Sequence, residues 1–186
     1  MPVHAGPALA LFGLLAIAGI FKLVSPGATA GALRATRLPS SMLTVRVLGV
    51  AEIAVGAAGM VLGSSVAAVA GAIFFGGFAW FVAHALRHRL PISSCGCLGT
   101  SDTPPSVVHL VFNLGAAVSL IACAMFPIGP WGGMDGVSWE QALPFAVFVG
   151  VTVYLFYALI AVLPQGRQPV DSVVRVPTPR PKASPV

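Results

Sequence analysis

Two of the chain's three cysteines are separated by a single residue, in the polar stretch 93–100. Only paired thiols can close a disulfide or bind a soft metal as a bidentate ligand, so Cys95 and Cys97 indicate chemistry that a lone thiol cannot perform. Gly96 lies between them and lets the backbone turn tightly enough to bring the two sulfur atoms together. A bridge over so short a spacing would be strained and easily reduced, which suits thiol–disulfide exchange.

Basic and imidazole side chains near the cysteines favour reactive thiolates. Arg87, Arg89 and His84 precede the pair closely enough to stabilise the thiolate, the form that attacks a disulfide. The same two thiolates, together with His84 or His109, could instead hold Cu(I) or Zn(II). The sequence leaves both readings open, beside a third in which the loop is chemically inert and the chain is a non-catalytic subunit of a membrane complex.

The elements that must position these residues are strongly apolar. Hydrophobic residues make up 57% of the chain and charged residues 8%, whereas a soluble domain carries about 25% charged residues. The mean hydropathy is +0.94. The sequence therefore predicts an all-α integral membrane protein. Five segments approach the roughly 20 residues that a bilayer core requires, namely 7–24, 43–62, 66–86, 106–126 and 142–163. They are continuously apolar rather than alternating, which disfavours a β-barrel.

Proline and glycine mark the predicted boundaries. Pro26 and Gly27 end the first span, and residues 63–65 form a tight turn between the second and third. Pro144 is expected in the first turn of the fifth span, where proline is tolerated. No Lys or Arg precedes the first apolar run, so it is expected to be a retained helix rather than a signal peptide. Closely spaced glycines in the second and third spans predict close helix packing.

The basic residues predict the orientation in the membrane. With five spans, all ten Lys and Arg residues fall on one side, and the positive-inside rule makes that side cytoplasmic. The N-terminus would then lie outside, and the loop with Cys95 and Cys97 would face the cytoplasm. The net charge of +5 is explained by this topology, so no nucleic-acid partner is expected. The bundle is predicted over residues 1–163, followed by a Pro-rich basic cytoplasmic tail at 164–186, which is expected to be disordered.

Glu52 lies in an unfavourable place for a charge. It is about nine residues into the second span, and therefore roughly 13 Å deep. A carboxylate at that depth must be protonated or paired. Lys22, near the inner end of the first span, is the nearest cation by depth, and a group on the fourth span is the alternative partner. Glu52 and His109 are candidate proton-handling groups.

The fourth span carries two further polar residues. His109 and Asn113 are four positions apart and share one helix face. Together with His84 they are expected at the same inner depth as Lys22 and Glu52. Lys22 and Asn113 are assigned structural polar roles. Cys123 is expected to be a buried, inert thiol, and His4 and His88 are expected at the surface.

These residues together resemble the MauE branch of the MauE/DoxX-like redox-associated membrane proteins. The matching pieces are Gly19-Ile20-Phe21-Lys22-Leu23, Glu52 with Gly56, Cys95-Gly96-Cys97-Leu98-Gly99 and Asn113. The family pattern has Phe where Leu98 stands and Arg where Phe112 stands, so a role that needs that arginine does not transfer. The resemblance covers about the first 125 residues and implies a four-helix core to which this chain adds a fifth helix.

The resemblance implies a multi-pass protein of the bacterial plasma membrane that assists disulfide formation in a partner protein. Members of the branch are similar to proteins needed for methylamine utilisation, where the partner is the small subunit of methylamine dehydrogenase. The main hypothesis is therefore a thiol–disulfide exchange protein in which Cys95 and Cys97 are the redox pair, with a thiol-containing protein and the lipid bilayer as partners. No bound cofactor is expected.

Overall fold

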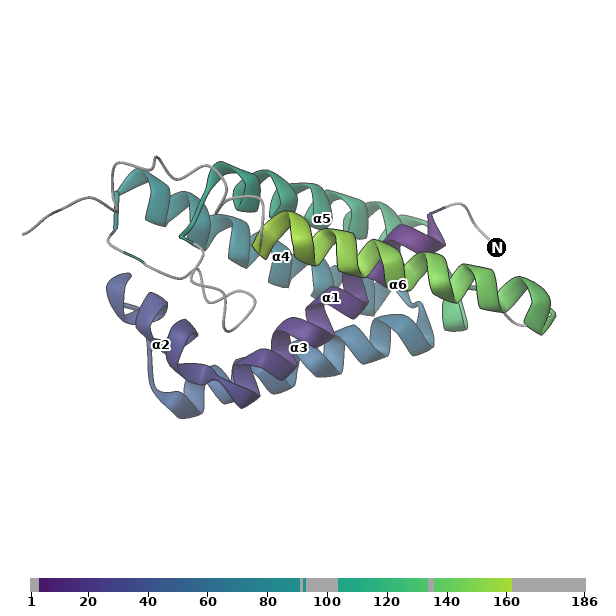
Figure 1. Cartoon of the computed structure of the whole chain (residues 1–186), viewed down its shortest axis with the longest axis horizontal. Coiled ribbons are helices and arrows are strands. Elements are labelled where there is room, and N and C mark those ends of the chain that lie inside the picture. Colours follow the sequence, from purple (N-terminus) through teal and green to yellow (C-terminus); the bar gives the residue numbers. More distant parts are fainter. Residues whose placement is uncertain (1–3, 91, 93–103, 134–135, 162–186) are drawn as a thin grey trace, which may run out of the picture.

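The structure is a bundle of long helices in a computed structural model that describes residues 4–90, 92, 104–133 and 136–161 (Figure 1). Within these described residues, five helices are long and apolar enough to cross a membrane, with mean hydropathies between 1.8 and 2.2. They are α1 (Ala5–Val24), α3 (Met42–Leu62), α4 (Ser65–Arg87), α5 (Val107–Met125) and α6 (Trp139–Ala161). The described residues contain no strand. The predicted all-α, multi-pass membrane fold is therefore confirmed.

A short helix that the apolar pattern did not predict follows the first span. Pro26 ends α1 as expected, but it also opens α2 (Pro26–Ala35), because a proline at the first helical position loses no intrahelical hydrogen bond. Thr29, Ala30 and Ala32 of α2 are buried. The short 3-10 helix η1 (Pro130–Gly132) was likewise not predicted.

The start of α6 corrects the expected place of Pro144. The helix begins at Trp139, so Pro144 lies inside it rather than in its first turn. The apolar run begins only at Ala142, but the preceding turn is helical because Ser138 accepts from the backbone N–H groups of Gln141 and Ala142. Glu140 also places a negative charge beside the helix N-terminus, which stabilises that end.

The turn between α3 and α4 is as tight as its sequence predicts. Gly63 ends α3 with φ of 54°, and its N–H bonds to the carbonyl of Gly59. A side chain at Gly63 would also collide with the backbone of Gly129. Ser64 then caps α4 by accepting a hydrogen bond from the N–H of Ala67 at 3.3 Å.

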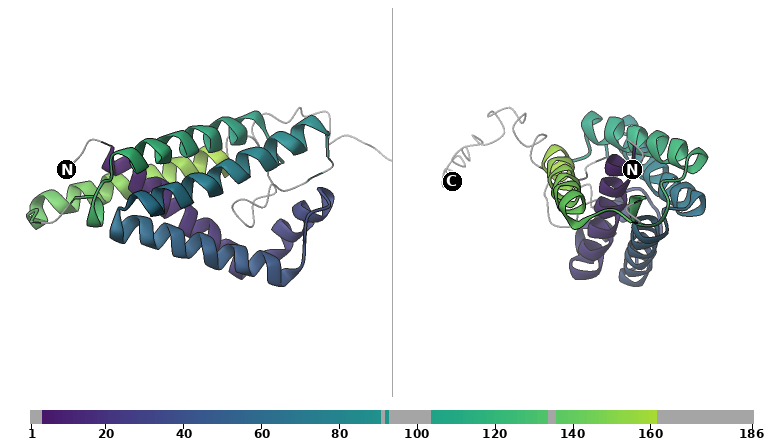
Figure 2. Two further views of the ribbon diagram at one scale, coloured as in Figure 1. Left: turned by 180° about the vertical axis from the view of Figure 1, so that it is seen from behind. Right: turned by 90° about the vertical axis from the view of Figure 1, so that its right-hand side faces the viewer.

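Helix α1 is the centre of the bundle. In the most apolar 18 residues of α1, 56% of the residues are buried, compared with 6% in α6. It packs closely against α3, while α4 packs against α5 and α6 lies along the outside of α1 (Figures 1 and 2). Phe12 of α1 is 1% exposed and lies directly against Gly59. Glycines on α3 thus provide the close approach that their spacing predicts.

The two ends of the bundle differ in charge. The C-terminal ends of α1 and α4, the N-terminal end of α3 and all of α2 lie at one end (Figure 1). Within the described residues, every Lys and Arg belongs to this end: Lys22, Arg34, Arg37, Arg46, Arg87 and Arg89. The opposite end holds the start of α1, the Gly63 turn and η1. Chain topology therefore gathers the basic residues on one side of the spans.

Candidate functional site

A buried ion pair joins α1 to α3 in the basic half of the bundle. Lys22 Nζ donates a hydrogen bond to Glu52 Oε2 at 2.9 Å, and the two side chains are 1% and 0% exposed. Gly19 and Gly49 lie beside the pair, where a Cβ on either residue would collide with the backbone of the other helix. The partner predicted for Glu52 from its depth is thus Lys22, and two glycines allow the helices to approach closely enough for the pair to form.

The hydrogen-bonding capacity of the ion pair is only partly satisfied. Lys22 Nζ also lies 5.2 Å from the centroid of the Phe78 ring, a cation–π contact that links the pair to α4. Glu52 Oε1 is buried and makes no hydrogen bond to any residue that the structure describes. A buried, unbonded carboxylate oxygen is costly, and ionisable groups inside a membrane mark functional sites by default.

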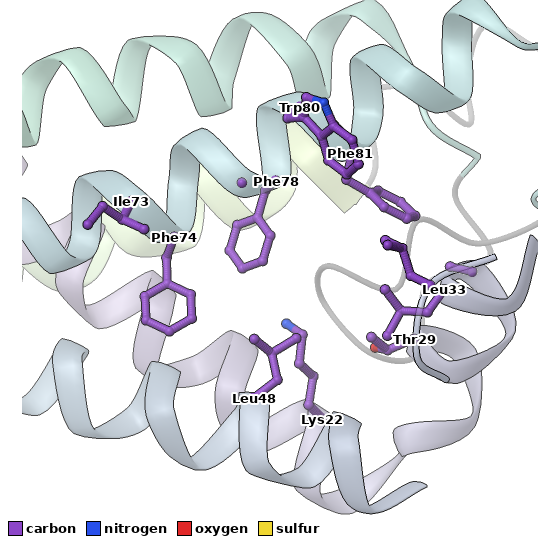
Figure 3. Close-up of a pocket in the computed structure, with 12 residues that line it drawn as sticks. Lys22, Thr29, Leu33, Leu48, Ile73, Phe74, Phe78, Trp80 and Phe81 are labelled. Atoms are coloured by element: carbon purple, nitrogen blue, oxygen red, sulfur yellow. The ribbon is translucent and has the colours of Figure 1, made fainter. Parts of the chain in front are cut away.

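Lys22 lies at the wall of an apolar pocket of about 320 Å³. The pocket is enclosed by α2, Leu48 of α3 and a stretch of α4 from Ile73 to Phe81. Figure 3 shows the Lys22 ammonium pointing toward Phe78, with Thr29 and Leu33 of α2 on the other side. All other lining residues are apolar, so Lys22 and Thr29 provide its polar groups. The volume lies in the range typical of small-molecule sites.

His109 forms a second buried polar site, on α5. The side chain is 1% exposed, and its Nδ1 shares a hydrogen bond of 2.8 Å with Ser106 Oγ. Asn113 Nδ2 donates to the carbonyl oxygen of His109 at 2.7 Å, as their shared helix face predicts. Both residues line a cavity of about 20 Å³, which is room for about one water molecule. Phe78 lines this cavity and also contacts Lys22.

The remaining predicted residues do not join these two sites. The His84 ring contacts the ring of Trp80 on α4 and that of His88, the residue that follows α4, with centroid distances of 5.5 and 4.4 Å. Cys123 is buried at 5% exposure in the main core, as expected. The described residues contain no group of three or more His, Cys, Asp or Glu side chains that could hold a metal ion.

Cys95 and Cys97 lie outside the described residues. The last described residue before them, Ile92, is 7% exposed and packs in a cluster with Ala32, Phe81, Val82 and Ala85. Two members of this cluster, Ala32 and Phe81, also line the apolar pocket. The chain therefore enters the cysteine-bearing segment beside the pocket that Lys22 borders.

Sequence patterns identified the charged residues of the site but not its apolar walls. The aromatic residues Phe74, Phe78, Trp80 and Phe81 fall within an uninterrupted apolar run, where a pocket-lining side chain and a lipid-facing one look alike. Only the crowding of five aromatic rings into the eight residues 74–81 indicated an unusual surface on α4. Thr29 was missed because the helix that carries it was not predicted.

Fold and site together define a multi-pass helical membrane protein with a buried ion pair beside an apolar pocket. The family model described as Methylamine utilisation protein MauE matches residues 2–127. The chain belongs to this family, as its sequence motifs suggested. The match includes the ion pair, the pocket and the Cys-x-Cys stretch, and it ends before α6. No curated protein and no solved structure shows significant similarity to the chain.

Proposed function

We propose that this protein is a membrane thiol–disulfide exchange protein that uses Cys95 and Cys97 as its redox pair and assists disulfide formation in a partner protein. The observation that carries the proposal is the buried Lys22–Glu52 pair, 2.9 Å apart. Its ammonium lines the same pocket as Phe81, which packs in one cluster with Ile92, the last described residue before the cysteines. A cation in a low-dielectric setting favours a nearby thiolate. Family membership adds support, because the matching family is associated with methylamine utilisation.

The chemistry is a two-electron exchange. A partner thiolate attacks one sulfur of the Cys95–Cys97 disulfide and forms a mixed disulfide, while the other cysteine leaves as a thiolate. A second partner thiol then resolves the mixed disulfide, so that the partner is oxidised and the Cys pair is reduced. Two protons pass from the partner thiols to the cysteine pair. Glu52 and His109 are the candidate groups to relay them, since both are buried ionisable residues in the same half of the bundle.

The proposed orientation places this chemistry at the cytoplasmic side. The gathering of the described Lys and Arg residues at one end of the bundle supports an outside N-terminus and a cytoplasmic C-terminus. The Cys-x-Cys segment joins α4 to α5 at the basic end.

Alkylation with a mass-tagged maleimide, before and after a reductant, tests the redox role in isolated membranes. Wild type, Cys95→Ser and Cys97→Ser are compared in a Cys123→Ser background, so that only the pair is scored. We expect a reductant-dependent shift in the parent that either substitution abolishes. One single variant should also trap a mixed disulfide with a partner, because its resolving thiol is missing.

Two results would contradict the proposal. If both cysteines are always free and copper or zinc co-purifies at stoichiometric level, the pair is a soft-metal site. If neither behaviour occurs and both variants resemble the parent, the segment has a structural role only.

A further inference from the structure

The apolar pocket beside Lys22 has a shape and chemistry that the exchange reaction alone does not use. It encloses about 320 Å³ between α2, α3 and α4, within the half of the bundle that carries the basic residues. A close-packed core leaves few voids larger than a water molecule. An open pocket of this size between membrane-spanning helices therefore points to a ligand.

The walls select a planar, apolar molecule. Phe74, Phe78, Trp80 and Phe81 contribute aromatic rings from one side of the pocket, and Leu33 of α2 faces them across it (Figure 3). Aromatic side chains bind flat rings by offset stacking and edge-to-face contact. An unbranched acyl chain would fill such a pocket without using these contacts.

The polar side of the pocket offers a hydrogen-bond donor to a ligand head. The Lys22 ammonium lines the pocket and is paired with the Glu52 carboxylate at 2.9 Å. Glu52 itself does not line the pocket, so the ammonium is the charged group nearest to a ligand. Carbonyl oxygens carry partial negative charge without a net charge, and they suit the edge of an ion pair in a low-dielectric site.

Two residues that line the pocket are also exposed on the membrane-spanning helix α4. Ile73 and Trp80 line it and are also 69% and 57% exposed on the outer surface of α4. Because α4 spans the membrane, these exposed side chains contact lipid. A ligand would therefore enter by diffusion within the membrane.

We infer that the pocket binds a membrane-soluble quinone. A quinone combines a flat ring, two neutral carbonyl groups and an apolar tail, which are the three features that the walls, the ion pair and the lipid-side entrance select. The inference rests on the proposed exchange function for its chemical purpose. When the Cys95 and Cys97 thiols close to a disulfide, two electrons and two protons pass to the quinone, which becomes the quinol.

Quenching of Trp80 fluorescence measures binding directly, because Trp80 lines the pocket. The other two tryptophans, Trp131 and Trp139, are replaced by Phe so that Trp80 is the sole reporter. The full chain in lipid nanodiscs is titrated with a decyl-substituted benzoquinone. We expect saturable quenching that decanol, which has the same tail but no ring, does not reverse.

Two glycines offer a matched pair of variants. Gly77 lines the pocket, and Gly115 lies on α5 outside its lining, and a Cβ added at either meets nothing within 4 Å. Gly77→Leu should weaken quinone binding about tenfold or more by filling the pocket, whereas Gly115→Leu should leave it unchanged. Leu33→Trp fills the pocket from α2 and should have the same effect if Gly77→Leu disturbs folding.

The titration is repeated in a Cys95→Ser/Cys97→Ser chain to separate quinone binding in the pocket from thiol–disulfide exchange by the cysteine pair. Retained saturable quenching there supports the pocket whatever the cysteines do. Quinol production that requires both cysteines and is lost with Gly77→Leu supports the link to thiol oxidation. Quenching that decanol reverses, or that both pocket-filling variants leave at the parental level, overturns the inference even if the cysteines exchange with a partner protein.

Discussion

At the scale of single residues, the Lys22–Glu52 pair is the feature that sequence reasoning predicted best. A carboxylate placed about 13 Å into an apolar span requires a partner, and few cations are available at that depth. The same reasoning could not predict the pocket, because its walls are ordinary apolar residues. Burial and depth constrain a charge strongly, but they say little about which of many Phe side chains faces a ligand rather than lipid.

Replacing one partner of the ion pair should lower the unfolding free energy far more than replacing both partners. Glu52→Leu leaves the Lys22 ammonium buried opposite an apolar side chain, and we expect a loss of about 3 to 5 kcal/mol in unfolding free energy. Glu52→Gln keeps a hydrogen-bond acceptor and should be milder. The double variant Lys22→Met/Glu52→Leu should recover most of the loss, because well-packed apolar replacements of a buried pair are often neutral.

Unfolding in a mixed-detergent titration of the parent, the single variants Lys22→Met and Glu52→Leu, and the double variant provides the double-mutant cycle for this prediction. Additive losses in the double variant would show that the two residues do not interact in the membrane. Wild-type stability for both Glu52 variants would show that the pairing does not matter for folding.

At the scale of elements, the five spans were predictable because length and continuous hydropathy are strong signals. The short helix α2 was not, since its ten residues are too few for a span and its opening proline was interpreted as an end. The start of α6 was placed three residues late because the capping turn is polar and aromatic. Packing between α1 and α3 depends on glycines, whose spacing indicated close contact but not which helix they contact.

Glycine-to-alanine substitutions should reveal where α1 and α3 touch. A Cβ at Gly19 would collide with the backbone of Gly49 and with Ile53, so Gly19→Ala should destabilise the bundle by about 1 to 3 kcal/mol. Gly31 of α2 has open space around it, and Gly31→Ala should instead be neutral or stabilising by roughly 0.5 to 1 kcal/mol.

The same detergent titration ranks these two variants against the parent. Because Gly19 is one turn from Lys22, Gly19→Ala should also weaken the coupling between Lys22 and Glu52 in the double-mutant cycle. Equal stability of the two alanine variants would mean that α1 and α3 are farther apart in the membrane than the structure has them.

At the scale of the whole molecule, hydropathy indicates how many times the chain crosses the membrane, and charge indicates the direction in which it does so. Continuous apolar runs indicate the number of spans, while the partition of Lys and Arg predicts which end faces the cytoplasm. The fold brings residues that are distant in sequence, such as Arg34 and Arg87, to the same end of the bundle. That grouping follows from five antiparallel crossings. A different number of spans would divide the basic residues between the two sides, so the predicted orientation depends on the number of spans.

Single-cysteine labelling of a cysteine-free chain tests this orientation. A cysteine introduced at position 100, in the connection between α4 and α5, should be protected from a membrane-impermeant maleimide added outside intact cells, and should react once the membrane is opened. A cysteine at Gly136, in the connection between α5 and α6, should show the opposite pattern and serves as the matched control. The reason is electrostatic, because moving the basic end outward would place at least six Lys and Arg residues against the positive-inside preference. Outside labelling at position 100 together with protection at position 136 would invert the proposed topology and move the thiol chemistry to the outer face.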